Sequence, residues 1–272
     1  MDTQHKIKAI AIDLDGTLLT SDKRITETTI QTLRQVMEKG VHVVIATGRS
    51  LATAIRFVEQ VGTTFPVVCY NGSCIYDPAT KKDLWHISLN HEICAEIVRI
   101  GKGSPAHLHA FMDHELYFTN CGREADYLEP LSSIVGKSVD FESFDNLHFT
   151  KAMFIGEIGE TERIRRHMHQ RFGNQLHMVY SHPDYFEIMT GGATKGSALQ
   201  RLMEIYGISA DETMAFGDAD NDKEMLSWAR YGIAMGNAHD EVKAIAAGIA
   251  GYNDDDGVAK KIREVFDLND PK

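Results

Sequence analysis

The sequence predicts an α/β protein in which a doubly wound parallel sheet is interrupted by a second domain of α+β type. Short apolar runs alternate with amphipathic helical stretches at both ends of the 272-residue chain, this alternation breaks off in the middle, and two of the apolar runs end in acidic clusters. Parallel strands need crossover connections, so alternation of strands and helices is typical of such a sheet. We expect a discontinuous core domain, 1–82 and 187–272, and an inserted domain, 83–186.

The first part of the core is predicted as alternating strands and helices. Ile7–Ile12 has the length and the β-branched content of a buried parallel strand. A helix follows, with Thr26 as its N-cap and Gly40 as its stop. The next predicted elements are a strand at Val41–Ala46, a helix that Ser50 caps, a strand at Val67–Tyr70 and a turn at Asn71-Gly72.

The middle of the chain has a different pattern. Strand-like runs such as 115–119 and 151–155 mix with helical stretches, of which Thr161–Phe172 is amphipathic. About a hundred residues can hold a core of their own, so we expect an α+β domain with partly antiparallel strands. His107 and His109 alternate in one predicted strand, and we expect them on a solvated sheet face rather than at a metal.

The alternation then resumes to the end of the chain. Gly207 ends the first of these helices, and Ser209–Glu212 resembles a capping box. The predicted elements are helices at Gly196–Tyr206, Lys223–Ala229, Asp240–Ala247 and Val258–Phe266 and strands at Met214–Gly217 and Tyr231–Met235.

Composition limits the classes of function. Apolar residues make up 43% and charged residues 25%, as in ordinary globular proteins. The net charge is −11 and no long Lys/Arg cluster occurs, so we expect no nucleic-acid partner. No apolar run approaches the roughly 18 residues of a membrane span, and the first residues show no signal-peptide core. We expect a cytoplasmic protein without a membrane partner; its oligomeric state is not predicted.

The cysteines give no sign of a disulfide framework or a zinc site. Cys69, Cys74, Cys94 and Cys121 show no C-x-x-C spacing in a chain without a secretion signal. Such cysteines are usually reduced and packed, which is what we expect here.

Two acidic clusters carry the functional signal. Asp13 and Asp15 follow the first apolar run, and Gly16 permits a sharp exit from the strand. The second cluster, Gly217–Asp222, closes the run at Met214–Phe216. Ligands of open α/β sheets bind beyond the carboxyl ends of the strands. An Asp-Gly pair alone is often only a turn, but two such clusters could share one divalent cation, and carboxylate oxygens favour Mg²⁺.

Together with neighbouring polar residues, these clusters predict a phosphoryl-transfer site. Thr47 offers a hydroxyl, Gly48 an unobstructed N–H and Lys195 a cation at a helix start, where a cation opposes the helix dipole. Asp13 is the predicted nucleophile, which forms an aspartyl-phosphate that water then hydrolyses. Asp15 is the predicted proton donor and base. A neighbouring carboxylate would raise its pKa and a metal would lower it, and the sequence leaves this balance open.

These residues resemble the haloacid dehalogenase-like superfamily, and within it the Cof-type phosphatases. The match rests on D-x-D-G-T-L at 13–18, T-G-R at 47–49, Lys195 in Thr194-Lys195-Gly196, and G-D-x-x-N-D at 217–222. The resemblance implies a Rossmann-like core with an inserted α+β cap. The cap would lie between Asn71 and Lys195, because only one helix and one strand fit between the first two motifs.

The resemblance also implies roles for individual residues. Asp13 would be nucleophile and metal ligand, Asp15 would ligate through its backbone carbonyl, and Asp218 would be the third protein ligand of Mg²⁺. The phosphate would be held by Thr47, Gly48, Lys195 and Asn221, with Asp222 supporting the metal shell. Arg49 is expected to form only a surface or helix-side ion pair.

The predicted function is therefore Mg²⁺-dependent hydrolysis of a small phosphorylated metabolite, with sugar phosphates as the leading substrates. Pyridoxal phosphate or flavin mononucleotide is an alternative substrate, because the cap determines substrate specificity and its contacts with the substrate cannot be derived from the sequence. A phosphomutase is a further alternative. From a different class comes a catalytically idle module that binds phosphate ligands without hydrolysing them.

Overall fold

The computed structural model describes residues 7–119 and 136–268, which fold into two compact units. The first unit comprises Met1–Arg49, Ala54–Leu84 and Thr194–Lys272, and the second comprises Ser50–Thr53 and Trp85–Ala193. The expected boundary at 186/187 falls inside a strand that continues to Thr190, so the second unit extends further along the chain than the sequence indicates.

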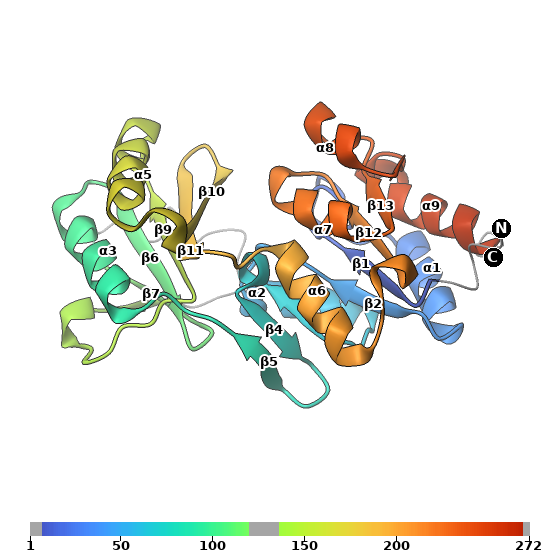
Figure 1. Ribbon diagram of the computed structural model, residues 1–272, viewed down its shortest axis with the longest axis horizontal. Helices are drawn as coiled ribbons and strands as arrows, with labels where there is room; N and C mark the ends of the chain where they lie inside the picture. The colour runs from blue at the N-terminus through green and yellow to red at the C-terminus, as the bar shows by residue number, and fades with distance from the viewer. Residues whose placement is uncertain (1–6, 120–135, 269–272) are drawn as a thin grey trace. The chain divides into compact units, whose positions relative to one another are not determined.

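The first unit contains a five-stranded parallel sheet with the order β14-β13-β12-β1-β2 (Figure 1). Its strands are β1 (Ala9–Ile12), β2 (His42–Ile45), β12 (Thr213–Gly217), β13 (Tyr231–Ala234) and β14 (Gly248–Ile249). All four residues of β1 are fully buried, as its apolar sequence requires. The predicted parallel-sheet core is confirmed.

Helices connect these strands and follow the last of them, as the alternating pattern predicts. They are α1 (Glu27–Glu38), α2 (Leu51–Val61), α6 (Lys195–Tyr206), α7 (Lys223–Trp228), α8 (Asp240–Ile245) and α9 (Gly257–Phe266). Thr26 caps α1 by accepting a hydrogen bond from the backbone N–H of Thr29. α1 packs against α9, and α6 packs against α7 (Figure 1).

A small antiparallel sheet follows α2; its first strand is predicted from the sequence, but its pairing with two further strands is not. It consists of β3 (Val67–Cys69), β4 (Cys74–Asp77) and β5 (Lys82–His86). The turn between β3 and β4 is tight because Tyr70 and Asn71 both have left-handed backbone angles, with φ of 51° and 53°. β5 is largely exposed and lacks a regular apolar alternation, so the sequence gives little signal for it.

The second unit is an α+β domain, as predicted. Its six-stranded sheet has the order β10-β11-β9-β6-β7-β8, and only the β7–β8 pair is parallel. The strands are β6 (His107–Met112), β7 (Glu115–Phe118), β8 (Lys137–Ser138), β9 (Lys151–Ile155), β10 (Leu176–His182) and β11 (Tyr185–Thr190). Helices α3 (His91–Gly103) and α5 (Ile158–Phe172) complete its hydrophobic core.

One expectation for this sheet is wrong. His107 and His109 are only 3% and 2% exposed, whereas a solvated face was expected. Both imidazole rings pack against the Phe118 ring of β7, with ring centroids 5.9 Å apart in each pair. They therefore contact an aromatic side chain and are shielded from solvent.

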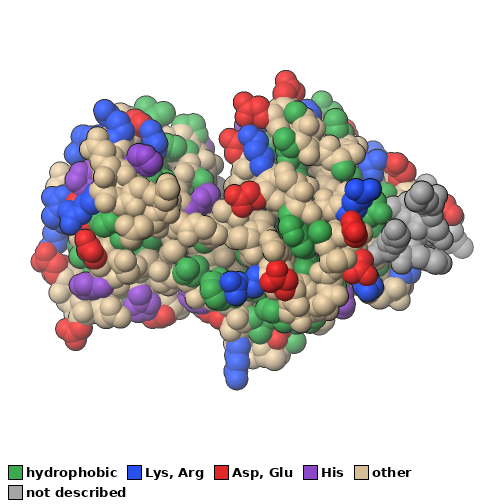
Figure 2. All heavy atoms as spheres, in the orientation of Figure 1, with side chains coloured by type: hydrophobic (Ala, Val, Ile, Leu, Met, Phe, Trp, Pro, Cys, Tyr) green, Lys and Arg blue, Asp and Glu red, His purple; other side chains and the backbone are tan. Residues whose placement is uncertain are grey.

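The surface of the second unit carries acidic and basic side chains close together (Figure 2). On α5, Arg163 pairs with Glu160 and Arg165 with Glu162, each three residues apart. Surface pairs at this spacing support a helix modestly.

Three of the four cysteines, Cys69, Cys74 and Cys94, are buried free thiols, and Cys121 lies outside the described residues. Over residues 7–119 and 136–268, no helix combines the length and the apolar character that crossing a bilayer requires.

Candidate active site

Strand register brings the two acidic clusters to one edge of the parallel sheet. β1 and β12 are neighbours, with Ile12 opposite Phe216, and the backbone N–H of Asp13 donates to the Phe216 carbonyl at 3.1 Å. Because the strands are parallel, the residues that follow them leave the sheet at the same end. Asp13 and Asp218 therefore meet although they are far apart in the sequence.

Three carboxylates form a compact set at this edge. Asp13, Asp218 and Asp222 each offer an oxygen within 4.8 Å of the others. The Thr17 hydroxyl donates to Asp218 at 3.0 Å, and one oxygen of Asp222 accepts from the backbone N–H groups of Asp218 and Ala219 at 3.0 and 3.1 Å. These bonds fix the second acidic loop around Asp222, which is fully buried.

Lys195 is the cation of this set. Its ammonium donates to Asp13 at 2.6 Å and to Asp222 at 2.8 Å, and the side chain is 2% exposed. Burial alone would lower the pKa of Lys195, but the two carboxylates outweigh it and raise the pKa above its ordinary value. Thr194 caps α6 with a reciprocal bond pair to Ser197, so Lys195 is fixed at the first position of the helix.

The carboxylates carry more negative charge than one lysine offsets. Burial, then the Asp222 and Asp218 charges, raise the pKa of Asp13 well above its ordinary value, although Lys195 opposes them. Burial and Asp222 raise the pKa of Asp218 to about 6, against the Thr17 hydrogen bond. A bound cation relieves repulsion among carboxylates that lie this close together.

The donor set fits a hard divalent cation. Asp13, Asp218 and Asp222 supply only oxygen atoms, and they lie close enough together to share one ion. Asp222 is thus a member of the carboxylate set, whereas the family resemblance assigns it only to the support of the metal shell. The Asp222 oxygen that contacts Lys195 is not the one that accepts the loop N–H groups, so both are already engaged.

Asp15 occupies a different environment from Asp13. Its carboxylate is bound by Arg49, whose Nε and Nη2 donate at 2.6 and 2.7 Å, and by the Lys23 ammonium at 2.8 Å. Burial would raise the pKa of Asp15, but Arg49 and then Lys23 lower it to about 2. Arg49 does form an ion pair, as expected, but its partner is the predicted catalytic residue Asp15 and not a surface or helix-side residue.

The remaining predicted phosphate ligands gather at the ends of β2 and β3. Thr47 is 1% exposed, and its hydroxyl accepts from the Arg49 N–H at 3.1 Å. The Asn221 amide donates to the side chain of Asn71 at 2.9 Å. Gly48 lies directly against Asn71, because a Cβ at Gly48 would stand 2.8 Å from the Asn71 oxygen. Sequence reasoning took Asn71 only as part of a turn.

Gly16 allows the first motif to approach the second. Its φ is +78°, and a Cβ there would lie 2.3 Å from an Asp218 oxygen. We expect Gly16→Ala to displace Asp218 and to lower both stability and metal-dependent activity. Gly40→Ala is the matched control, because Gly40 has φ of +84° with nothing within 4 Å of the added Cβ.

Gly40→Ala measures the cost of backbone strain alone, which is about 1–2 kcal/mol for a non-glycine residue with left-handed backbone angles. Thermal melting and calorimetric Mg²⁺ titration of both variants separate the two effects. Equal Mg²⁺ affinity in Gly16→Ala and Gly40→Ala would show that the Gly16 contact with Asp218 has no role in the site.

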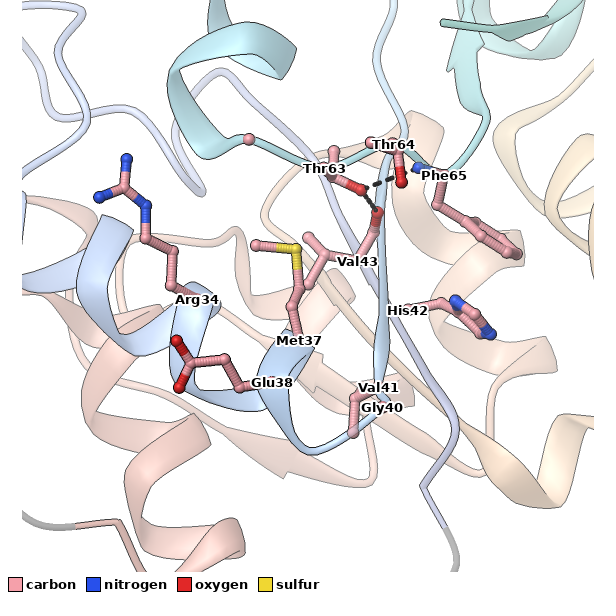
Figure 3. A pocket seen from close by; sticks show the side chains of 11 residues that line it. Arg34, Met37, Glu38, Gly40, Val41, His42, Val43, Thr63, Thr64 and Phe65 are labelled. Atoms are coloured by element: carbon pink, nitrogen blue, oxygen red, sulfur yellow. Dashed lines mark hydrogen bonds between the residues drawn. The ribbon is translucent and has the colours of Figure 1, made fainter. Parts of the chain in front are cut away.

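A pocket of about 450 Å³ lies at the opposite end of β2 and is not part of this site. Its lining residues come from the end of α1, the start of β2 and the segment before β3 (Figure 3). The Thr63 hydroxyl there already donates to the Val43 carbonyl at 2.7 Å. It lacks the carboxylate cluster, since Glu38 is its one acidic lining residue.

The chain matches the sequence profile of the haloacid dehalogenase-like hydrolases over residues 10–262. It is 30% identical over 282 residues to the 5-amino-6-(5-phospho-D-ribitylamino)uracil phosphatase of Bacillus subtilis, covering 95% of this chain and 97% of that protein. It is 31% identical over 237 residues to the HMP-PP phosphatase of Serratia proteamaculans, covering 86% of each.

Solved structures agree with the sequence matches. A haloacid dehalogenase-like hydrolase from Bacteroides thetaiotaomicron superimposes with a TM-score of 0.88 at 27% identity, over 96% of this chain and all of that one. The four motifs, the sheet order and the relatives point the same way. The chain belongs to the haloacid dehalogenase-like hydrolases, the family that its motifs predict.

Proposed function

We propose that the chain is a Mg²⁺-dependent phosphatase that hydrolyses small phosphomonoesters through an aspartyl-phosphate on Asp13. The observation that carries this proposal is the compact set of Asp13, Asp218 and Asp222, two of which, Asp13 and Asp222, bind the buried Lys195 ammonium. Such a set combines a nucleophile with positive charge for phosphate oxygens. Phosphoryl transfer depends mainly on positioning and on charge compensation.

In the first step, one Asp13 oxygen attacks phosphorus while the bond from phosphorus to the ester oxygen breaks. Asp15 gives a proton to that oxygen and the alcohol leaves, which requires that bound substrate first replace the Arg49 and Lys23 contacts that favour the ionised form of Asp15. In the second step, the Asp15 carboxylate takes a proton from water as the water oxygen bonds to phosphorus. The Asp13–phosphorus bond breaks, and inorganic phosphate forms.

The other site residues bind and orient the phosphoryl group. Lys195 would hold one peripheral oxygen by its charge, and Thr47, Gly48 and Asn221 would donate hydrogen bonds to others. A divalent cation held by Asp13, Asp218 and the Asp15 carbonyl would supply the remaining positive charge. Asp222 would keep Lys195 and the second acidic loop in place, as its hydrogen bonds indicate.

Removal of metal tests the cofactor. We expect EDTA to lower phosphate release by about 10²-fold or more, because a metal contributes several kcal/mol of charge stabilisation to such transfers. Excess Mg²⁺ added after EDTA should restore the rate, which controls for damage by the chelator. A rate that persists in EDTA, with metal content verified by elemental analysis, would rule out a metal-dependent mechanism.

A substrate panel tests the reaction class. We propose sugar phosphates as substrates, and the relatives named above support small phosphorylated compounds in general. Phosphate release should be measured over sugar phosphates, pyridoxal phosphate and flavin mononucleotide with added Mg²⁺. Isomer formation without free phosphate would indicate a phosphomutase, and binding without either product would indicate an idle phosphate-binding module.

The two units are proposed to be the core and cap domains of this enzyme. The core would comprise residues 1–82 together with the segment that begins after β11, and the cap would comprise the inserted unit. We also propose that the protein acts in the cytoplasm on small metabolites.

A further inference from the structure

The turn between β3 and β4 is hydrogen-bonded to the loop that follows β2. The backbone N–H of Asn71 donates to the Thr47 carbonyl oxygen at 3.1 Å, and the backbone N–H of Tyr70 donates to the Arg49 carbonyl oxygen at 2.9 Å. The Asn71 side chain lies directly against Gly48. The turn is therefore attached to the segment that carries Thr47 and Gly48, two of the predicted phosphate ligands.

The same turn also reaches the segments of the two other phosphate ligands, Lys195 and Asn221. A Cβ at Gly72 would lie 2.1 Å from the carbonyl oxygen of Thr194, the residue before Lys195. The Asn71 side-chain oxygen accepts a hydrogen bond of 2.9 Å from the Asn221 amide. One turn thus contacts three separate parts of the chain that together supply all four predicted ligands.

Asn71 is fixed in place, whereas Asn221 depends on it. Asn71 is 2% exposed, and its φ of 53° and ψ of 27° are left-handed angles that asparagine adopts more readily than most residues. Asn221 is only half-buried, and the bond to Asn71 is the one side-chain hydrogen bond described for it. The position of the Asn221 amide is therefore set by Asn71.

The chemistry of this bond determines which end of the Asn221 amide faces Asn71. An amide NH₂ group donates and an amide oxygen only accepts, so turning the Asn221 amide around would bring two acceptor oxygens together. In the observed orientation one N–H of Asn221 binds Asn71, and the same NH₂ group has a second N–H that can bind a phosphoryl oxygen. The reversed amide would turn its oxygen toward that anion and repel it.

We propose that Asn71 is the positioning residue for Asn221: its side-chain oxygen holds the Asn221 amide so that an N–H faces the phosphoryl group. This proposal rests on the proposed function, because it requires Asn221 to bind a phosphoryl oxygen. Asn71 acts through Asn221 and not through the carboxylates. Its loss should therefore weaken phosphate binding and leave the affinity for Mg²⁺ unchanged.

Asn71→Gly tests this role, because glycine removes the acceptor oxygen and adopts left-handed angles without strain. We expect the inhibition constant of inorganic phosphate to rise by about 10-fold, which is the usual contribution of one hydrogen bond to a charged group. The calorimetric dissociation constant for Mg²⁺ should change by less than about twofold. The assay follows the alcohol released from a phosphomonoester that the wild type hydrolyses, so inorganic phosphate can be added as the inhibitor.

Lys81→Gly is the matched control. Lys81 also has a left-handed φ, of 57°, but it is exposed in the turn between β4 and β5 and has no described contact with a site residue. This variant controls for added backbone freedom and should leave both constants unchanged. Asn71→Ser replaces Asn71→Gly if melting curves show that the glycine variant is unfolded, because the serine hydroxyl ends one bond short of the Asn71 oxygen.

A double-mutant cycle tests whether Asn71 acts through Asn221. In an Asn221→Ala background, adding Asn71→Gly should raise the inhibition constant of inorganic phosphate by less than about twofold, because the amide to be oriented is already absent. Losses that multiply in the double variant would show that Asn71 acts independently of Asn221 and would overturn the positioning role.

The remaining outcomes distinguish this proposal from the proposed function. An unchanged phosphate inhibition constant in Asn71→Gly would overturn the positioning role while leaving the phosphatase assignment intact. An equal loss of Mg²⁺ affinity would do the same, because the turn would then support the whole acidic loop rather than one amide. If the wild type hydrolyses no phosphomonoester with Mg²⁺, the proposed function itself fails.

Discussion

Asp13→Asn should abolish turnover and leave the protein folded. The amide is nearly the same size as the carboxylate but is a poor nucleophile, so we expect kcat to fall by about 10³-fold or more. Burial and two neighbouring carboxylates already disfavour the charge on Asp13. Its removal should therefore not destabilise the fold, and Lys195 keeps Asp222 as its partner.

Phosphate release with Mg²⁺, together with thermal melting, checks this prediction. Asp220→Asn is the control, since Asp220 lies in the second acidic loop beside Asp218 and Asp222, is exposed and contacts only Lys223 among its described ion pairs. The control should retain wild-type activity. Unchanged hydrolysis by Asp13→Asn would remove Asp13 as the nucleophile.

Lys195→Met should lower both activity and stability. The variant leaves Asp13 and Asp222 buried without their shared cation, and breaking a buried ion pair in this way costs about 3–5 kcal/mol. Loss of a preorganised charge at the phosphoryl oxygens should lower kcat by about 10²- to 10³-fold. Denaturant unfolding and steady-state kinetics measure the two effects separately.

Two further variants make this result specific. Lys223→Met removes an ammonium whose partners, Asp220 and Glu241, are on the surface, and it should unfold near the wild-type midpoint. Adding Asp222→Asn to Lys195→Met should recover part of the lost stability, because one uncompensated charge is removed. A Lys195→Met protein as stable and active as the wild type would show that Lys195 is dispensable.

The strands and motifs of the parallel sheet can be predicted from the sequence because a buried strand appears there as a short apolar run. β1 and β12 are continuous apolar runs, and Asp13 and Asp218 follow them directly. Since parallel strands end at one edge, the meeting of these two residues can be inferred without coordinates. The helix stop at Gly207 is likewise a local property, seen as a left-handed C-cap.

What the sequence leaves out depends on partners distant along the chain. Arg49 belongs to a recognised motif, but its pairing with Asp15 arises only when β1 and β2 align. Asn71 looks like a turn residue, and its contact with Asn221 bridges two separate loops. The burial of His107 and His109 depends on Phe118 of a neighbouring strand, so alternation alone could not predict it.

The central claim is that phosphate is carried on Asp13 during turnover. The most direct measurement is to quench the enzyme during hydrolysis, reduce the acyl phosphate with borohydride and locate the modified residue by peptide mass spectrometry. The account predicts homoserine in place of Asp13, dependent on substrate and absent from Asp13→Asn. Modification at another carboxylate, or none while the enzyme turns over and a known aspartyl-phosphate control is trapped, would contradict it.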